Sequence, residues 1–310
     1  MPRVTICLPV YNCEESIDAC LASALTQSYD DFDCLVVDNA STDSTFERVE
    51  AHTDPRVRAV RNPENIGPNP NHNRCIELAD GDLIQFLHSD DLLLPDCLSR
   101  LAPAFDHPRV GLAFARRRIE PPHTEWAAAY ATLHTPLEPL DDVNDGMAIV
   151  RRWVNQGSKG NWIGEPTSVM LRRSVLLEVG GFSTEMQYCD DLELWLRILA
   201  RSDAAWVDEE LSVRGHDEET LTATYFKDDS AWLDQLWVLS ALVRNPDLEG
   251  RIRMKALRQW TLAAAKKVVR ATQAPSGIRR SRYRQLGRHI RLSMGPTQPE
   301  LISGRYLHTR

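Results

Sequence analysis

Long hydrophobic runs are absent from this 310-residue sequence, and none approaches the roughly 18 to 20 apolar residues of a membrane-spanning helix. Residues 1–6 lead directly into a predicted strand, so we expect no signal peptide. The seven cysteines are scattered, odd in number and never spaced as Cys-x-x-Cys. We therefore expect reduced thiols, a cytoplasmic location and no zinc site.

Two glycine-rich phosphate-binding motifs are missing as well. No Gly-x-Gly-x-x-Gly follows the first predicted strand, and no Gly-x-x-x-x-Gly-Lys-Ser/Thr loop occurs. A glycine cradle for phosphates is therefore excluded. A phosphorylated ligand would have to be held by side-chain carboxylates and a metal ion.

The composition is ordinary, but the charge is unevenly distributed. Apolar residues make up 43% of the chain and charged residues 26%, as in a soluble globular protein of one large or two modest domains. Residues 251–310 contain 15 of the 36 basic residues and one of the 44 acidic residues, which gives this segment a charge of about +14. Because the net charge is −8, the rest of the chain carries about −22. A basic segment of this kind can bind anionic lipid, nucleic acid or the acidic body of its own chain.

The first 90 residues alternate between the two kinds of hydrophobic periodicity. Short apolar runs predict strands at residues 4–10, 32–38, 57–60 and 83–87, and helical patterns lie between them. Alternation with short loops predicts an α/β fold, with a Rossmann-like, mostly parallel sheet flanked by helices.

A polar cluster follows the strand predicted at residues 83–87. His88, Ser89, Asp90 and Asp91 come directly after it. Open α/β sheets bind ligands at the carboxyl ends of their strands, and carboxylates with an imidazole can hold Mg²⁺ or Mn²⁺. The alternative is a solvated turn with a capping aspartate for the next helix.

Later segments are less regular. Residues 120–144 contain proline and histidine with weak periodicity, which predicts an excursion or loop near the site. Asp190 and Asp191 begin a predicted helix, where the helix dipole alone would also account for them. We expect a first domain over residues 1–220 and a helical, basic C-terminal extension over residues 221–310.

Taken in order, these segments resemble family 2 glycosyltransferases of the GT-A fold, and the resemblance covers about residues 3–220. The matching stretches are CLPVYN (7–12), LVVDNASTD (35–43), RNPENIG (61–67), NRCIELADGD (73–82), FLHSDD (86–91), GEP (164–166), VGGF (179–182), CDDLELWLR (189–197) and RGH (214–216). Each stretch is weak alone, whereas the ordered set is a strong signal.

The resemblance implies an inverting enzyme that transfers a sugar from a nucleotide-sugar donor, with UDP expected, to an acceptor hydroxyl. It assigns Asp191 as general base with Asp190 beside it, Asp90 and His216 to a Mn²⁺ or Mg²⁺ site, and Trp162 and Glu165 to the acceptor side. The residues that it assigns to the nucleotide pocket are Pro9, Tyr11, Asn12, Asp38, Asn65, Asn73 and Ser89. The alternative is that Asp38 and Asn39 only start a turn.

His88 departs from the family pattern, because it stands where the DXD motif has its first acidic residue. It either ligates the metal without adding negative charge or faces the ribose or the sugar. This departure and the long C-terminal extension keep open a second interpretation, a non-catalytic nucleotide-sugar-binding or assembly protein. A nucleotidyltransferase is disfavoured, since the expected Gly-rich basic first loop is absent.

The partners expected from the resemblance are a nucleotide-sugar donor and a glycan or lipid-linked acceptor in surface polysaccharide or glycoconjugate synthesis, with no nucleic acid. For the basic C-terminal segment, the hypothesis is peripheral attachment to the inner face of the membrane. Its alternative is a solvated helical face or a clamp on the acidic body.

Overall fold

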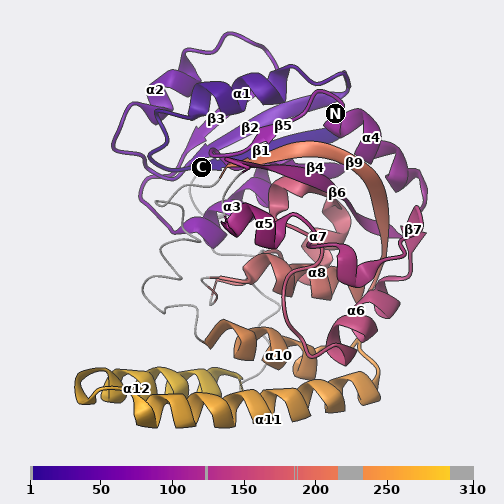
Figure 1. Cartoon of the computed structure of the whole chain (residues 1–310). Helices are drawn as coiled ribbons and strands as arrows, with labels where there is room; N and C mark the ends of the chain where they lie inside the picture. The colour runs from indigo at the N-terminus through magenta and orange to yellow at the C-terminus, as the bar shows by residue number, and fades with distance from the viewer. Residues whose placement is uncertain (1–2, 123–124, 185, 187, 216–232, 294–310) are drawn as a thin grey trace.

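The structure is a computed structural model that describes residues 3–122, 125–184, 186, 188–215 and 233–293. In this part of the chain, a central β-sheet has helices on both faces, and three C-terminal helices form a further layer beneath one of them (Figure 1).

The first four strands form the parallel half of the sheet, as predicted. They are β1 (Val4–Val10), β2 (Phe32–Asp38), β3 (Val57–Arg61) and β4 (Leu83–Phe86). β1 lies between β2 and β4, and β3 pairs with β2. The connecting helices are α1 (Ile17–Leu25), α2 (Thr45–Glu50) and α3 (Pro68–Leu78). Alternate β1 residues are buried in two apolar cores, since Cys7 faces one side of the sheet and Ile6 and Leu8 face the other.

The second half makes the sheet mixed. Its strands are β5 (Leu92–Leu93), β6 (Val110–Glu120), β7 (Val143–Asn144), β8 (Val169–Arg172) and β9 (Asp203–Gly215). The strand order is β3-β2-β1-β4-β8-β6-β9-β5, and β7 pairs with β9. Six strands run in the direction of β1, whereas β5, β7 and β8 are antiparallel to their neighbours. The carboxyl ends of β6 and β9 therefore lie at the same edge as those of β1, β2 and β4.

Residues 120–144, which we predicted to be irregular, contain short elements. These are α5 (Glu125–Tyr130), η2 (Thr135–Leu137) and β7. Helices of one or two turns are too short to produce a clear 3.6-residue period, which explains why the sequence pattern missed them.

The remaining helices cover the two faces. One face carries α1, α2, α4 (Cys97–Leu101) and η1 (Ala102–Asp106). The other carries α3, α6 (Gly146–Asn155), α7 (Arg173–Val179) and α8 (Asp190–Leu199), with η3 (Pro166–Ser168) before β8. Trp195 in α8 is fully buried at the centre of this second core.

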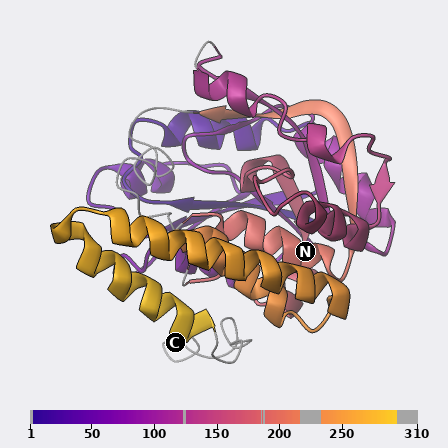
Figure 2. The same cartoon turned by 60° about the horizontal axis from the view of Figure 1, so that its bottom comes forward.

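The C-terminal extension is helical, as predicted. It consists of α10 (Asp234–Arg244), α11 (Gly250–Gln273) and α12 (Ser276–Ser293). α11 and α12 form an antiparallel pair that runs across the molecule (Figure 2). Val238, Leu242 and Ile252 belong to the same apolar core as α6 and α8, so the start of the extension is packed onto the sheet domain. Among the described residues, no helix is long and apolar enough to cross a membrane.

Candidate active site

The parallel strands bring the predicted nucleotide residues to one edge of the sheet. Val10 at the end of β1 pairs with Asp38 at the end of β2, and β4 on the other side of β1 leads into His88. Strand ends that are distant in sequence thus converge, which is the usual ligand site of an open α/β sheet. Pro9 is partly buried there, and Tyr11 is exposed.

The loops after β1 and β2 are tied together by Asn12. Its side-chain Oδ1 accepts a hydrogen bond from the Thr42 backbone N–H at 2.8 Å, and its own N–H donates to Ser41 Oγ at 2.9 Å. Asn12 adopts φ = 47°, a left-handed conformation that asparagine tolerates better than most residues. Tyr11, the residue before Asn12, is exposed on the same loop.

Asp38 is completely buried at the end of β2. Its Oδ2 accepts the Ser41 N–H at 3.1 Å and lies 3.3 Å from Nε of Arg61. The carboxylate is therefore charge-paired and fixed in orientation. These contacts stabilise the turn after β2, which was the alternative interpretation of Asp38. The predicted contact of Asp38 with a nucleoside stays a prediction.

Asn65 and Asn73 make structural hydrogen bonds. Asn65 Oδ1 accepts from Asn39 Nδ2 and from the Gly67 N–H, both at 2.9 Å, which closes the loop before α3. Asn73 exchanges two hydrogen bonds with the backbone of Phe182, donating at 2.9 Å and accepting at 2.7 Å. Asn73 thus connects α3 to the segment before α8, and the nucleotide-binding roles of both asparagines stay predictions.

The turn after β4 gathers three potential cation ligands. One atom each of His88, Asp90 and Asp91 lies within 4.8 Å of the other two, and His88 Nδ1 is 4.0 Å from Asp91 Oδ2. Asp90 is exposed, His88 and Ser89 are partly buried, and Asp91 is buried. Two carboxylates and an imidazole on one turn suit Mn²⁺ or Mg²⁺. The predicted metal residues Asp90 and His88 therefore lie together, and Asp91 joins them.

Asp91 is the best anchored of the three. Its Oδ2 accepts a hydrogen bond from Thr167 Oγ1 at 2.5 Å, and its Oδ1 accepts the Gly215 N–H at 3.0 Å. Burial, followed by the negative charge of Asp90, raises the pKa of Asp91 well above its usual range. A bound cation would offset that unfavourable burial of charge. The residues present thus fit a divalent metal.

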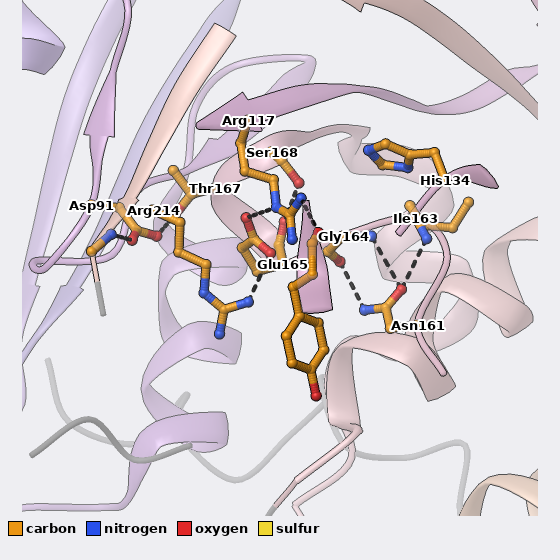
Figure 3. A network of polar contacts seen from close by, with 12 residues as sticks. Asp91, Arg117, His134, Asn161, Ile163, Gly164, Glu165, Thr167, Ser168 and Arg214 are labelled. Carbon is orange, nitrogen blue, oxygen red and sulfur yellow. Dashed lines mark hydrogen bonds and ion pairs between the residues drawn. The ribbon is translucent and has the colours of Figure 1, made fainter. Parts of the chain in front are cut away.

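Beside Asp91 lies a buried charge network centred on Glu165 (Figure 3). Arg117 Nε from β6 donates to Glu165 Oε1, and Arg214 Nη1 from β9 donates to Oε2, each at 2.9 Å. Arg117 also donates to the backbone oxygen of Tyr130 at 3.0 Å. Burial alone would raise the pKa of Glu165, but the charges of Arg214 and Arg117 lower it below its usual value. Glu165 therefore stays ionised and clamps two strands.

Arg214 connects this network to the other acidic groups. Burial alone would lower its pKa, but the carboxylates of Glu165, Asp91, Asp191 and Asp90 together raise it. One guanidinium therefore lies within electrostatic reach of both the acidic turn and the start of α8.

Asp190 and Asp191 begin α8, as the sequence predicted. Both side chains are partly buried, and Asp191 Oδ2 accepts a hydrogen bond from Asn161 Nδ2 at 2.9 Å. Burial raises the pKa of Asp191 to about 6, while burial and the neighbouring Asp191 raise that of Asp190 to about 8. A carboxylate that titrates close to neutral pH is suited to accept a proton during catalysis.

Trp162 and Glu165, predicted on the acceptor side, are both buried. The Trp162 backbone oxygen accepts from Nδ1 of His134 at 2.8 Å, and Gly164 O accepts from Trp195 Nε1 of α8 at 2.9 Å. The loop over residues 160–165 is thus attached to α8 on one side and to Arg117 and Arg214 on the other. Its acceptor-side role stays a prediction. His216, the other predicted metal ligand, lies outside the described residues.

Several residues of the site carried little sequence signal. His72, Arg117, Asn161 and Thr167 contact site residues only through the tertiary fold. Asp91 was visible in the polar cluster, but its burial and its partners were not. A charged residue inside a strand, such as Arg117 in VGLAFARRRIE, is the one available hint, since it has to be paired when buried.

The fold is that of GT-A glycosyltransferases. A crystal structure of S. aureus TarS in complex with UDP-GlcNAc matches with a TM-score of 0.69 at 17% identity, covering 97% of this chain and 83% of that chain. The mannosyltransferase PcManGT of Pyrobaculum calidifontis, in complex with GDP-Man and Mn²⁺, matches with a TM-score of 0.59 at 19% identity, covering 95% and 81%. At these identities, the likeness establishes the fold alone.

The family follows from sequence. The profile described as "Glycosyl transferase family 2" matches residues 5–178, more than half of the chain. An uncharacterized protein of Mycobacterium tuberculosis (strain CDC 1551 / Oshkosh) is 40% identical over 259 residues, which are 84% of this chain and 81% of that protein. The chain therefore belongs to glycosyltransferase family 2, as its motifs predicted.

A relative of named activity is similar over a shorter stretch. The UDP-Glc:alpha-D-GlcNAc-diphosphoundecaprenol beta-1,3-glucosyltransferase WfaP of Escherichia coli is 29% identical over 120 residues, 39% of this chain. The match spans only 48% of the length of WfaP.

Proposed function

We propose that this protein is an inverting glycosyltransferase that moves a sugar from a nucleotide-sugar donor, most simply a UDP-sugar, to an acceptor hydroxyl. The observation that carries the proposal is the joint arrangement of two acidic groups. The His88–Asp91 turn is suited to a cation, Asp191 is suited to a base, and Arg214 lies within electrostatic reach of both.

Asp191 is the residue that would accept the proton of the acceptor hydroxyl. An alcohol is a poor nucleophile, and a carboxylate within hydrogen-bond reach removes its proton as it attacks the sugar. Inversion needs one such base, on the face of the sugar opposite the leaving group. The pKa of about 6 keeps Asp191 mostly ionised at neutral pH, and the Asn161 amide fixes the direction of one oxygen.

Asp90, Asp91 and His88 would hold Mn²⁺ or Mg²⁺. When bound, the ion supplies positive charge that stabilises the departing nucleoside diphosphate. Metal dependence is also supported by the Mn²⁺ complex of PcManGT. His216 would be a further ligand by position in the family motif.

The donor class is inferred from relatives together with the edge of the sheet. TarS was solved with UDP-GlcNAc, and WfaP is named for UDP-Glc and a diphosphoundecaprenol-linked acceptor. In this chain, Pro9 and Tyr11 would lie against the base, and Asp38 would accept from the ribose or the base. We propose a glycan or lipid-linked acceptor in surface polysaccharide or glycoconjugate synthesis.

A thermal-shift panel tests the donor site. Purified protein is heated with UDP, GDP, dTDP or CDP, each with and without Mn²⁺. A ligand at 100-fold its dissociation constant stabilises by about 2.7 kcal/mol, which raises the melting temperature by several degrees. We expect UDP to give the largest shift and to need the metal. No shift with any nucleotide would contradict the proposal.

Turnover separates the enzyme from the non-catalytic binder that His88 left open. Release of UDP from a panel of UDP-sugars is measured with and without a mixture of glycan and lipid-linked acceptors. Acceptor-dependent release supports transfer. A donor that binds and is never turned over would favour a binding or assembly protein.

We also propose that the α11–α12 pair attaches to an anionic membrane surface. Leu262, Val269 and Ile278 are each at least half exposed, and exposed arginines such as Arg284 and Arg288 lie on α12. Apolar side chains among basic ones fit an interface of anionic lipid.

The attachment is tested by co-sedimentation with phosphatidylglycerol and phosphatidylcholine vesicles. The variant Arg284→Glu/Arg288→Glu should lose binding to the anionic vesicles. The control Arg48→Glu/Arg118→Glu removes two exposed arginines from the sheet domain and should keep it. Equal binding of both variants would contradict the attachment.

A further inference from the structure

His72 of α3 makes an unusual contact with His88. Its ring packs against Phe86 and Phe182, with centroids 5.3 and 4.9 Å away, and stands edge-on to His88 at 5.1 Å. The two Nε2 atoms are 2.9 Å apart, so one proton lies between them. Either ring could carry that proton, depending on the tautomers of the two histidines.

The other ring nitrogen of His72 shows which of the two rings carries the shared proton. His72 Nδ1 lies 2.9 Å from the backbone oxygen of Pro68, and a carbonyl oxygen can only accept, so Nδ1 carries a proton. A neutral His72 then has a free lone pair on Nε2. The ring is packed against Phe86 and Phe182, and these apolar surroundings disfavour a charged imidazolium. The shared proton therefore belongs to Nε2 of His88, and His88 Nδ1 is left with a lone pair.

That lone pair faces the acidic turn. His88 Nδ1 is 4.0 Å from Asp91 Oδ2, too far for a hydrogen bond, and both oxygens of Asp91 already accept one each. A nitrogen lone pair turned toward a buried carboxylate is unfavourable unless a positive group lies between them. A divalent cation has the right charge and takes both kinds of ligand.

We propose that His72 is a positioning residue, which holds His88 in the Nε2–H tautomer so that Nδ1 ligates a divalent cation together with Asp90 and Asp91. The inference rests on the proposed function and extends it, because it specifies which nitrogen of His88 ligates the metal and gives His72 a role. An acceptor behind a ligating histidine is the usual way to fix its tautomer, and losing such a partner typically costs about 10- to 100-fold in metal affinity.

Two substitutions of His72 separate tautomer control from packing. His72→Phe keeps a ring between Phe86 and Phe182 but removes the acceptor for His88. His72→Gln offers a side-chain oxygen in place of Nε2. Titration with Mn²⁺ in the presence of UDP should show affinity about tenfold or more weaker for His72→Phe. His72→Gln should stay within about threefold of the wild type. Equal losses in both variants would overturn the inference.

Spectroscopy reads the tautomer and the ligand directly. In ¹⁵N-labelled metal-free protein, the His88 ring should show a protonated Nε2 and an unprotonated Nδ1, and His72→Phe should change this pattern. Pulsed electron paramagnetic resonance is measured on Mn²⁺ bound to the His216→Ala variant, which lacks the other imidazole proposed as a ligand. It should show coupling to a ¹⁴N nucleus that the additional substitution His88→Ala removes.

The outcomes distinguish this inference from the proposed function. A proton on His88 Nδ1 in the wild type would overturn it. Mn²⁺ that binds without nitrogen coupling would also overturn the inference, because His88 would then face the ribose or the sugar. That result would leave the proposed donor site unaffected. If no Mn²⁺ binds with or without UDP, the metal part of the proposed function fails as well.

Discussion

Asn161 Nδ2 donates a hydrogen bond to Asp191 Oδ2 at 2.9 Å. The same amide nitrogen donates to Gly164 O at 2.9 Å, and Asn161 Oδ1 accepts the N–H groups of Ile163 and Gly164. One side chain therefore shapes the loop over residues 160–165 and orients the carboxylate that we propose as the base.

Asn161→Ala should move the acidic limb of the pH–rate profile to higher pH. The Asn161 hydrogen bond lowers the pKa of Asp191, which burial raises to about 6, so removing the amide raises that pKa further. Because a base has to be deprotonated, kcat/KM should fall more at pH 6 than at pH 8. Exposed Asn155→Ala is the control. A uniform loss at all pH values would mean that Asn161 acts only through the loop.

Asp191→Asn should abolish transfer while nucleotide binding survives. General bases typically contribute about 10²- to 10⁴-fold, and asparagine keeps the shape without accepting the proton. Asp190→Asn, its neighbour on α8, should lose less activity. Rates are compared with UDP affinity from the thermal-shift panel. Loss of UDP binding in Asp191→Asn would contradict the base role.

Glu165→Gln should destabilise the protein strongly. It leaves the guanidinium groups of Arg117 and Arg214 buried without their carboxylate, and breaking a buried pair in this way costs about 3–5 kcal/mol. Asp106→Asn removes an exposed partner of Arg3 and should cost under about 1 kcal/mol. Urea unfolding measures both, and similar small losses would show that the network contributes little.

The same network predicts how stability depends on pH. The pKa of Glu165 is lower in the folded protein than its usual 4.5, so its contribution is complete above that value and is lost as pH falls through the lowered pKa. The stability difference between wild type and Glu165→Gln should therefore narrow under acidic conditions. A constant difference from pH 7 down to pH 3 would contradict this assignment.

Gly215→Ala should disturb the acidic turn. A Cβ at this position would lie 2.1 Å from the backbone oxygen of Asp90, so the backbone has to move, and the Gly215 N–H bond to Asp91 weakens with it. We expect a lower melting temperature and weaker Mn²⁺ binding. Gly287→Ala in α12 is the control, since its Cβ would meet nothing within 4 Å and alanine favours a helix. Unchanged Mn²⁺ binding in Gly215→Ala would contradict the close contact.

Much of the sheet edge where we propose nucleotide binding could be predicted from the sequence, because strand ends and local turns are short-range features. Short apolar runs identified β1, β2, β3 and β4, and their parallel order placed Asp38 and His88 at one edge. Asp191 at a helix start was equally visible. The mixed half of the sheet was not, since the antiparallel insertion of β8 between β4 and β6 depends on which surfaces pack best.

The sequence by itself determined the residue types at the strand ends, the α/β class and the helical extension, because hydrophobic periodicity and turn chemistry act over a few neighbouring residues. Only the tertiary structure decided that His72 meets His88 and that Arg117 and Arg214 share Glu165. Those pairs join separate elements, and packing of the whole core sets their distances. The tautomer of His88 and the raised pKa of Asp191 arise from such contacts and from burial, which local sequence does not encode.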